Sequence, residues 1–154
     1  MRRAGRLGLI GAAAMLAAAP LAGCSRSVSV AVPAQGTSPA CTALARAWPA
    51  SVSGLEPVDT DPVSPAVRAY GDPAVIARCG VPEPGPSTDC LSVSGVDWVV
   101  STLSDGARFV TFGRSPALEV LVPQGHTTPG NEGSLLPVFG PAAQTLPADG
   151  RRCS

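Results

Sequence analysis

Apolar and polar residues alternate with a period of two over much of residues 74–123 of this 154-residue chain. This period indicates β-strands, because successive side chains of a strand point to opposite faces of a sheet. Gly and Pro separate the alternating runs, as expected for turns. The pattern predicts a small, mostly antiparallel sheet of four to five strands, at residues 74–81, 90–95, 96–114 (a hairpin of two strands) and 117–123.

The hairpin at residues 96–114 also has a predicted register. Asp105-Gly106 is a favoured centre for a two-residue type I′ turn, in which both residues need positive φ. The predicted pair Asp97–Arg114 has opposite charges and would fix the register, with a contribution of about 0.2–1 kcal/mol to stability. The alternative interpretation is that these two residues form a binding site. The register predicts that Ser104 faces Ala107, Trp98 faces Gly113 and Asp97 faces Arg114, and that Trp98, Val100 and Phe109 share one face.

A helical period predicts two helices, one before the predicted strands in the sequence and one after them. Residues 39–48 place apolar side chains at i, i+3, i+4 and i+7, with Ser38 as a capping residue. Residues 135–146 keep the same spacing, although Pro141 should divide them into two turns. A further short helical turn is predicted over residues 64–70. We therefore expect an α+β fold, in which the sheet packs with one N-terminal and one C-terminal helix.

The N-terminus has the pattern of an export signal. Three arginines precede an uncharged, apolar run over residues 7–21, which is shorter than the roughly 20 residues of a spanning helix. Leu21-Ala22-Gly23-Cys24 resembles the bacterial lipobox. The resemblance implies cleavage before Cys24 and a palmitate-type lipid on its thiol. An ordinary signal peptide with a stray cysteine and a twin-arginine signal are the alternatives.

These features divide the chain into three parts. Residues 1–23 are predicted to be a lipoprotein signal peptide, residues 24–40 a lipidated Cys and a flexible tether, and residues 41–154 a single globular domain. The tether is rich in Ser and also contains Pro, Gly and Gln, which is typical of linkers. Val28, Val30 and Val32 alternate with small residues, so a short edge strand is the competing interpretation.

Four cysteines remain once Cys24 is assigned to lipid, and an even number in an exported chain indicates disulfides. Three pairings are possible. We favour Cys79–Cys90, between the ends of two predicted neighbouring strands, and Cys41–Cys153, which would staple the domain ends. Zinc is the alternative, but the spacings contain no C-x-x-C pair and the chain has one histidine.

Charge argues against a nucleic acid as partner. Removal of residues 1–23 takes three of the 11 Arg, which leaves eight against 11 acidic residues and no Lys anywhere. A net charge of −3 without a basic cluster does not suit a polyanion.

Several motifs together resemble a known family. They are ACTAL (40–44), AYGDPAVIARCGVP (69–82), SGVDW (94–98) and FVTFGRSPALEVLVP (109–123). In this order they resemble an actinobacterial lipoprotein and membrane-anchored family, a domain of unknown function. Tyr70 stands where that family suggests Trp. The resemblance implies an envelope location and no known activity.

Catalytic chemistry has little support in the sequence. The single histidine, His126, lies in a Gly- and Pro-rich loop, and GRSPA (113–117) lacks the second glycine of a nucleophile elbow. We expect no enzyme, no cofactor and no metal, but a lipid-anchored binding or accessory module on the outer face of the cytoplasmic membrane, with another envelope protein as a partner. The alternatives are a small envelope hydrolase, using a carboxylate pair such as Asp59–Asp61 or Asp89–Asp97, and a small-ligand or lipid-binding lipoprotein. The candidate binding residues are Arg78, Asp97 and Arg114.

Overall fold

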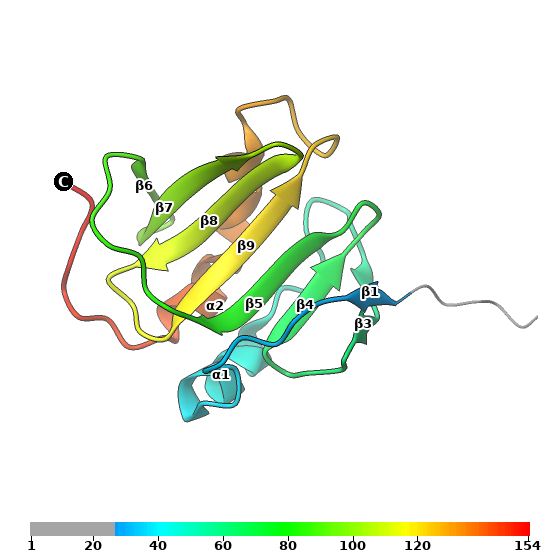
Figure 1. Cartoon of the computed structure of the whole chain (residues 1–154), viewed down its shortest axis with the longest axis horizontal. Coiled ribbons are helices and arrows are strands. Elements are labelled where there is room, and N and C mark those ends of the chain that lie inside the picture. Colours follow the sequence, from blue (N-terminus) through cyan, green and yellow to red (C-terminus); the bar gives the residue numbers. More distant parts are fainter. Residues whose placement is uncertain (1–26) are drawn as a thin grey trace, which may run out of the picture.

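Seven strands form one antiparallel sheet in the computed structural model, which describes residues 27–154 (Figure 1). The predicted signal peptide, the lipobox and Cys24 fall within residues 1–26, outside this range. The strand order is β2-β4-β5-β9-β8-β7-β6. The strands are β2 (Pro57–Val58), β4 (Val67–Tyr70), β5 (Val75–Val81), β6 (Cys90–Val93), β7 (Val96–Leu103), β8 (Gly106–Phe112) and β9 (Ala117–Pro123).

A second, two-stranded sheet lies beside β4 (Figure 1). It pairs β1 (Val28–Ser29) in parallel with β3 (Thr60–Asp61). The chain after β1 runs along β5 on the face opposite the helices, where Gln35 N donates to Gly80 O at 3.2 Å (Figure 1). The competing interpretation of an edge strand at Val28 is therefore confirmed. From Val28 onward, the segment predicted to be a flexible tether lies on the domain.

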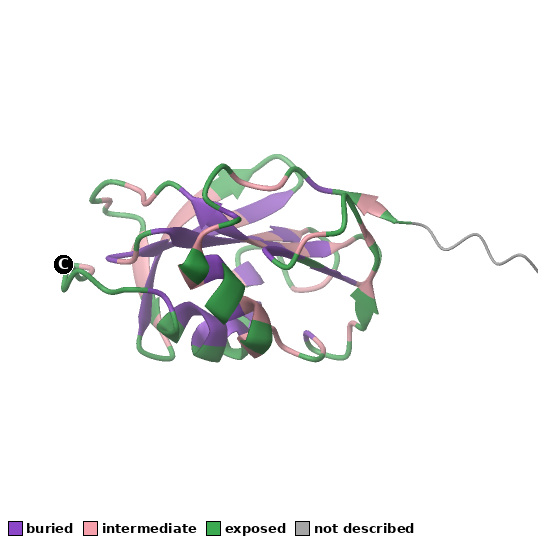
Figure 2. Cartoon of the chain, turned by 90° about the horizontal axis from the view of Figure 1, so that it is seen from below, coloured by how far each residue is buried: buried purple, intermediate pink, exposed green. Residues whose placement is uncertain are grey.

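The helices are short and lie together on one face of the large sheet (Figure 2). The first is α1 (Pro39–Leu44), where Ser38 Oγ accepts from Cys41 N as predicted, and it continues as the 3-10 turn η1 (Ala45–Ala47). The second pair is η2 (Glu132–Phe139) and α2 (Gly140–Gln144), which divide next to Pro141 as the sequence indicates. Their apolar side chains form the main core with the inner face of the sheet, around Tyr70, Trp98 and Phe109.

The predicted fold class is wrong. Residues 27–154 are mostly β, with seven strands in the large sheet instead of four to five, and the two α-helices in this range have six and five residues. Residues 67–70, predicted as part of a helical turn, form β4 and pair with β5. The tertiary pairing outweighs the local capping pattern at Ser64, because β4 gains a full ladder and buries Val67, Ala69 and Tyr70.

The predicted strands are confirmed, but the hairpin register is not. β5, β6 and β9 lie within the predicted ranges, whereas Leu103 faces Gly106, so Ser104 and Asp105 form the turn. Asp97 faces Phe112 and Trp98 faces Thr111, and the predicted Asp97–Arg114 and Trp98–Gly113 pairs do not form. The shift is two residues, so every side chain keeps its face.

The cause of this error is the role of Gly106. A side chain at this position would collide with the carbonyl oxygen of Val122 on β9. Gly106 is thus needed for the close approach of two strands and not for the turn itself. Two-residue loops with two positive φ angles occur elsewhere in residues 27–154: Ser94-Gly95, at 51° and 74°, joins β6 to β7, and Ser53-Gly54, at 48° and 83°, joins the bridged residues Val52 and Leu55.

Two disulfides join Cys41 to Cys79 and Cys90 to Cys153, with Cα separations of 5.5 and 5.7 Å. The predicted Cys79–Cys90 and Cys41–Cys153 pairing is wrong. Strands β9, β8 and β7 lie between β5 and β6. Four strand spacings separate Cys79 from Cys90 by roughly 19 Å, beyond the roughly 7 Å that a disulfide spans.

We predict the effect of removing each disulfide. The closed loops span 38 and 63 residues, and the chain-entropy estimate for each is about 4 kcal/mol. The double variant C41A/C79A should lose more stability than C90A/C153A in urea unfolding, because Cys41 and Cys79 are fully buried in the core. Non-reducing peptide mapping that recovered a Cys79–Cys90 peptide would contradict the pairing.

A second prediction concerns Tyr70, the chain's only tyrosine. Its hydroxyl donates to Pro49 O at 2.9 Å, and burial raises the pKa of Tyr70 to about 12. The folded protein should therefore ionise this tyrosine near pH 12, as followed by ultraviolet absorbance. The stability linked to the neutral phenol is complete below pH 10 and is lost as the pH rises through this pKa.

The Tyr70→Phe variant is the control for this titration. It should remove the absorbance change entirely and cost about 1 kcal/mol for the lost hydrogen bond. A native-state titration at the ordinary pKa of 10.0 would show that the phenol is solvated.

Candidate functional site

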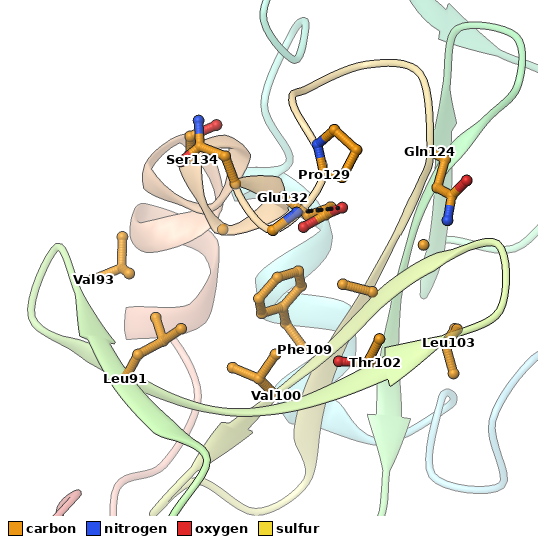
Figure 3. A pocket seen from close by; sticks show the side chains of 15 residues that line it. Leu91, Val93, Val100, Thr102, Leu103, Phe109, Gln124, Pro129, Glu132 and Ser134 are labelled. Carbon is orange, nitrogen blue, oxygen red and sulfur yellow. Dashed lines mark hydrogen bonds between the residues drawn. The ribbon is translucent and has the colours of Figure 1, made fainter.

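A groove lies where β6, β7 and β8 meet the loop at residues 124–134 (Figure 3). It has a volume of about 480 Å³. A second hollow adjoins it along the edge of β7, and the two share Leu91, Val100 and Thr102. We call the two together the edge groove. Its apolar lining includes Leu91, Val93, Val100, Leu103, Phe109 and Pro129, and its polar lining includes Asp89, Thr102, Gln124, Asn131, Glu132 and Ser134.

The edge groove exists because β6 is shorter than its neighbour. β6 has four residues and β7 has eight, so the end of β7 extends past its partner. The last backbone hydrogen bond on the β6 side of β7 runs from Val100 N to Asp89 O, at 2.8 Å. Beyond Val100, no strand among residues 27–154 pairs with this edge of β7. Because backbone groups of a strand alternate between its two edges, Thr102 points its N–H and C=O to this open edge.

The apolar floor of the groove follows from the alternation along β7 and β8. Val100 faces Phe109 across the two strands, on the face that also carries the core. Figure 3 shows the Phe109 ring in the middle of the groove, with Leu91 and Val100 beside it and the loop residues above. A side chain at Gly133 would approach both Phe109 and Leu91, so η2 begins directly over this floor.

The charge of the edge groove is negative. Glu132 is 8% exposed, and its Oε1 accepts from Gly130 N at 3.2 Å. Asp89 lines the other end and is exposed. No Arg or His lines either hollow, and among residues 27–154 no cation pairs with Glu132. The groove thus contains a largely buried carboxylate without a counter-charge.

The three candidate binding residues do not converge. Arg78 lies on β5, where its guanidinium binds Glu119 through Nε–Oε2 and Nη2–Oε2 distances of 2.9 and 2.8 Å. Arg108 on β8 binds the other oxygen of Glu119 at 2.9 Å. Glu119 is fully buried and joins three neighbouring strands on the face opposite the helices. The direct pairing of Arg78 with Glu119 in the β5–β9 register produces this cluster.

Asp97 and Arg114 lie together elsewhere. They line one small cleft beneath the C-terminal residues, which Arg78 does not reach. Asp97 is buried and accepts from Ser92 Oγ and from Cys153 N, the latter at 2.9 Å. Arg114 donates to Leu146 O at 2.7 Å. Burial lowers the pKa of Arg114 and so does nearby Arg152, while Asp97 acts in the opposite direction. Each of the two side chains fastens the C-terminal segment to the sheet.

Two further findings concern other possible sites. Within residues 27–154, no group of three His, Cys, Asp or Glu side chains could hold a metal ion. In the same part of the chain, no helix has both the length and the apolar character needed to cross a bilayer. His126 contacts Pro73 O and does not line the edge groove.

Sequence reasoning missed Glu132 and Thr102. Glu132 was an unremarkable acid at the edge of a predicted loop, and Thr102 one polar residue in a predicted strand. A signal did exist, because the run that became β6 was shorter than the run that became β7. The strand order that turns this difference into a groove could not be obtained from the residues alone.

We predict unequal costs for disrupting the Glu119 cluster. Glu119→Gln should cost about 1.5–3 kcal/mol, the range for hydrogen bonds to charged groups, because Arg78 and Arg108 stay partly solvated with side-chain exposures of 27% and 38%. The double variant R78M/R108M should cost about 3–5 kcal/mol, because it leaves a buried carboxylate unpaired. Urea unfolding compares the two, and a larger cost for Glu119→Gln would refute the burial of this charge.

Comparison with known protein families matches residues 6–148 to the family described as "Protein of unknown function (DUF3515)". Comparison with curated proteins gives no match. Comparison with solved structures gives none either. The matched range contains almost all of the described structure, including the edge groove and the Glu119 cluster. The chain therefore belongs to the DUF3515 family.

Proposed function

We propose that this chain is a lipid-anchored binding module on the outer face of the cytoplasmic membrane, and that the edge groove holds its partner, another envelope protein. The observation that carries the proposal is the groove itself. It combines an apolar floor with a few polar groups, which is the usual composition of a binding site.

Sequence features support the anchor. An apolar run ends in Leu21-Ala22-Gly23-Cys24, which resembles a lipobox. Two acyl chains on Cys24 would hold a protein stably on a bilayer without a basic patch. The two disulfides also suit an oxidising compartment outside the cytoplasm.

The polar groups of the groove favour binding over hydrolysis. A serine or threonine nucleophile needs a base within hydrogen-bond reach. The groove hydroxyls belong to Thr88, Ser101, Thr102 and Ser134, and within residues 27–154 none of them donates to Glu132. The carboxylate is held instead by the backbone of Gly130. This arrangement is suited to recognising a ligand.

Crosslinking in intact cells tests the proposal. A photo-crosslinking residue at Leu103, on the exposed rim of the groove, should capture one specific envelope protein. The same residue at Val63, which is 89% exposed and lines no part of the groove, is the matched control and should not. The captured complex should carry palmitate label and sediment with membranes.

The anchor has its own control in this experiment. Cys24→Ala should abolish the label and release the chain from the membrane fraction. Retained label in this variant would overturn the lipid anchor, and identical products from Leu103 and Val63 would overturn the groove as the binding surface.

A further inference from the structure

We propose that the edge groove binds an extended, basic peptide segment of the partner protein, which adds a strand to the free edge of β7 and places an Arg or Lys side chain against Glu132. This inference rests on the proposed function, since it names the kind of partner that the groove accepts. Three features of the groove carry it: the open strand edge, the apolar floor and the carboxylate without a cation.

The edge of β7 is open and unprotected. Thr102 points its backbone N–H and C=O to the side where β6 has already ended. Natural proteins usually protect such an edge with charged residues, with Pro or with a covering loop. Ser101, Thr102 and Leu103 provide neither charge nor Pro, and Leu103 is 38% exposed. Strand addition is a recurrent way of binding a peptide at such an edge.

The apolar floor fits the stem of a long basic side chain. Lys and Arg pack their methylene groups along apolar surface and extend the charge beyond it. A strand added at β7 would lie beside Leu91 and Val100, with Phe109 further in (Figure 3). Side chains on one face of that strand would therefore point into the groove, toward Glu132 at the start of η2.

Glu132 is the specific determinant. A buried carboxylate is costly unless a cation and several hydrogen bonds compensate it. Glu132 has one hydrogen bond, from a backbone amide, and no cation among the described residues. The other Glu132 oxygen is not among the fully enclosed, unpartnered side-chain atoms of residues 27–154, so it is accessible from the groove. A guanidinium or ammonium group from a partner would supply the counter-charge and further donors there. Asp89 at the other end of the groove extends the same preference for a basic segment.

A small amine would use fewer of these features. It could bind Glu132 and the apolar floor, but it would leave the Thr102 edge unpaired and would not reach Asp89 at the same time. An extended peptide engages all three. The negative groove also has no basic residue of its own, so an acidic segment would be repelled.

The test uses the full chain in detergent and fluorescence anisotropy. The probe is a labelled octapeptide of alternating Val and Thr with one central Arg. Two comparison peptides carry Gln or Glu in place of that Arg. We expect the Arg peptide to bind at least tenfold more tightly than the Glu peptide. Glu132→Gln should strongly reduce this preference, because only Asp89 then remains in the groove, and Glu56→Gln, which deletes one exposed charge outside the groove, should leave it unchanged.

The strand edge has its own pair of variants. Thr102→Pro removes the edge N–H without removing a β7–β8 hydrogen bond, because this N–H points away from β8. It should weaken the Arg peptide at least tenfold, and Thr102→Val, which keeps the N–H, should not. Thermal unfolding that matches the parent chain shows that both variants are folded.

Each other outcome overturns the inference. Equal binding of the Arg and Glu peptides, or no binding, would refute a basic occupant. Full competition by butylguanidine, together with an unaffected Thr102→Pro variant, would assign the groove to a small cation. If the peptide experiment fails in either way but the crosslinker at Leu103 still captures a partner in cells, the proposed function stands and only the peptide inference fails. If the peptide experiment fails and the crosslinker at Leu103 captures no partner, both proposals are refuted.

Discussion

The pairing of β5 with β9 is the interaction on which the rest of this structure depends. β5 belongs to the first half of the domain and β9 ends a hairpin series that begins on the far edge of the sheet. Without this pairing the large sheet would separate into β2-β4-β5 and β6-β7-β8-β9. The Arg78–Glu119 pair sits within its register, and Cys79 on the same strand fastens α1 to the inner face. One strand contact therefore organises both faces of the sheet.

The same topology places the edge groove. Because β5 and β9 are central, the chain after β5 must pass the whole width of β9, β8 and β7 before β6 begins. β6 then forms the outer edge with only four residues. The free end of β7, the loop after β9 and the start of η2 meet at that corner. The groove is a consequence of strand order and strand length acting together, and its Glu132 carboxylate lies at the start of η2, which this order brings there.

Several features could be predicted because their causes are local. The Ser38 cap, the strands β5, β6 and β9, and the faces of Trp98, Val100 and Phe109 follow from capping chemistry and a period of two. The errors have a common physical origin in contacts between distant segments. The local sequence predicts Gly106 as a turn residue, but the close approach of β9 is what requires glycine there. It predicts a helical turn at residues 67–70, but pairing with β5 makes them a strand. The sequence predicts that Cys79 and Cys90 are neighbours, but three strands lie between them in the sheet.

What the amino-acid sequence determined by itself was the position of strands β5 to β9, the cap of the first helix, the shared face of Trp98, Val100 and Phe109, and the likeness of the N-terminus to a lipobox. These depend on residues within a few positions of one another, so the local free energy decides them. Only the tertiary structure decided the strand order, the disulfide partners, the hairpin register and the edge groove. Each of these depends on which distant segments share a ladder, and that choice is made by the burial of the whole sheet and not by any one stretch of chain.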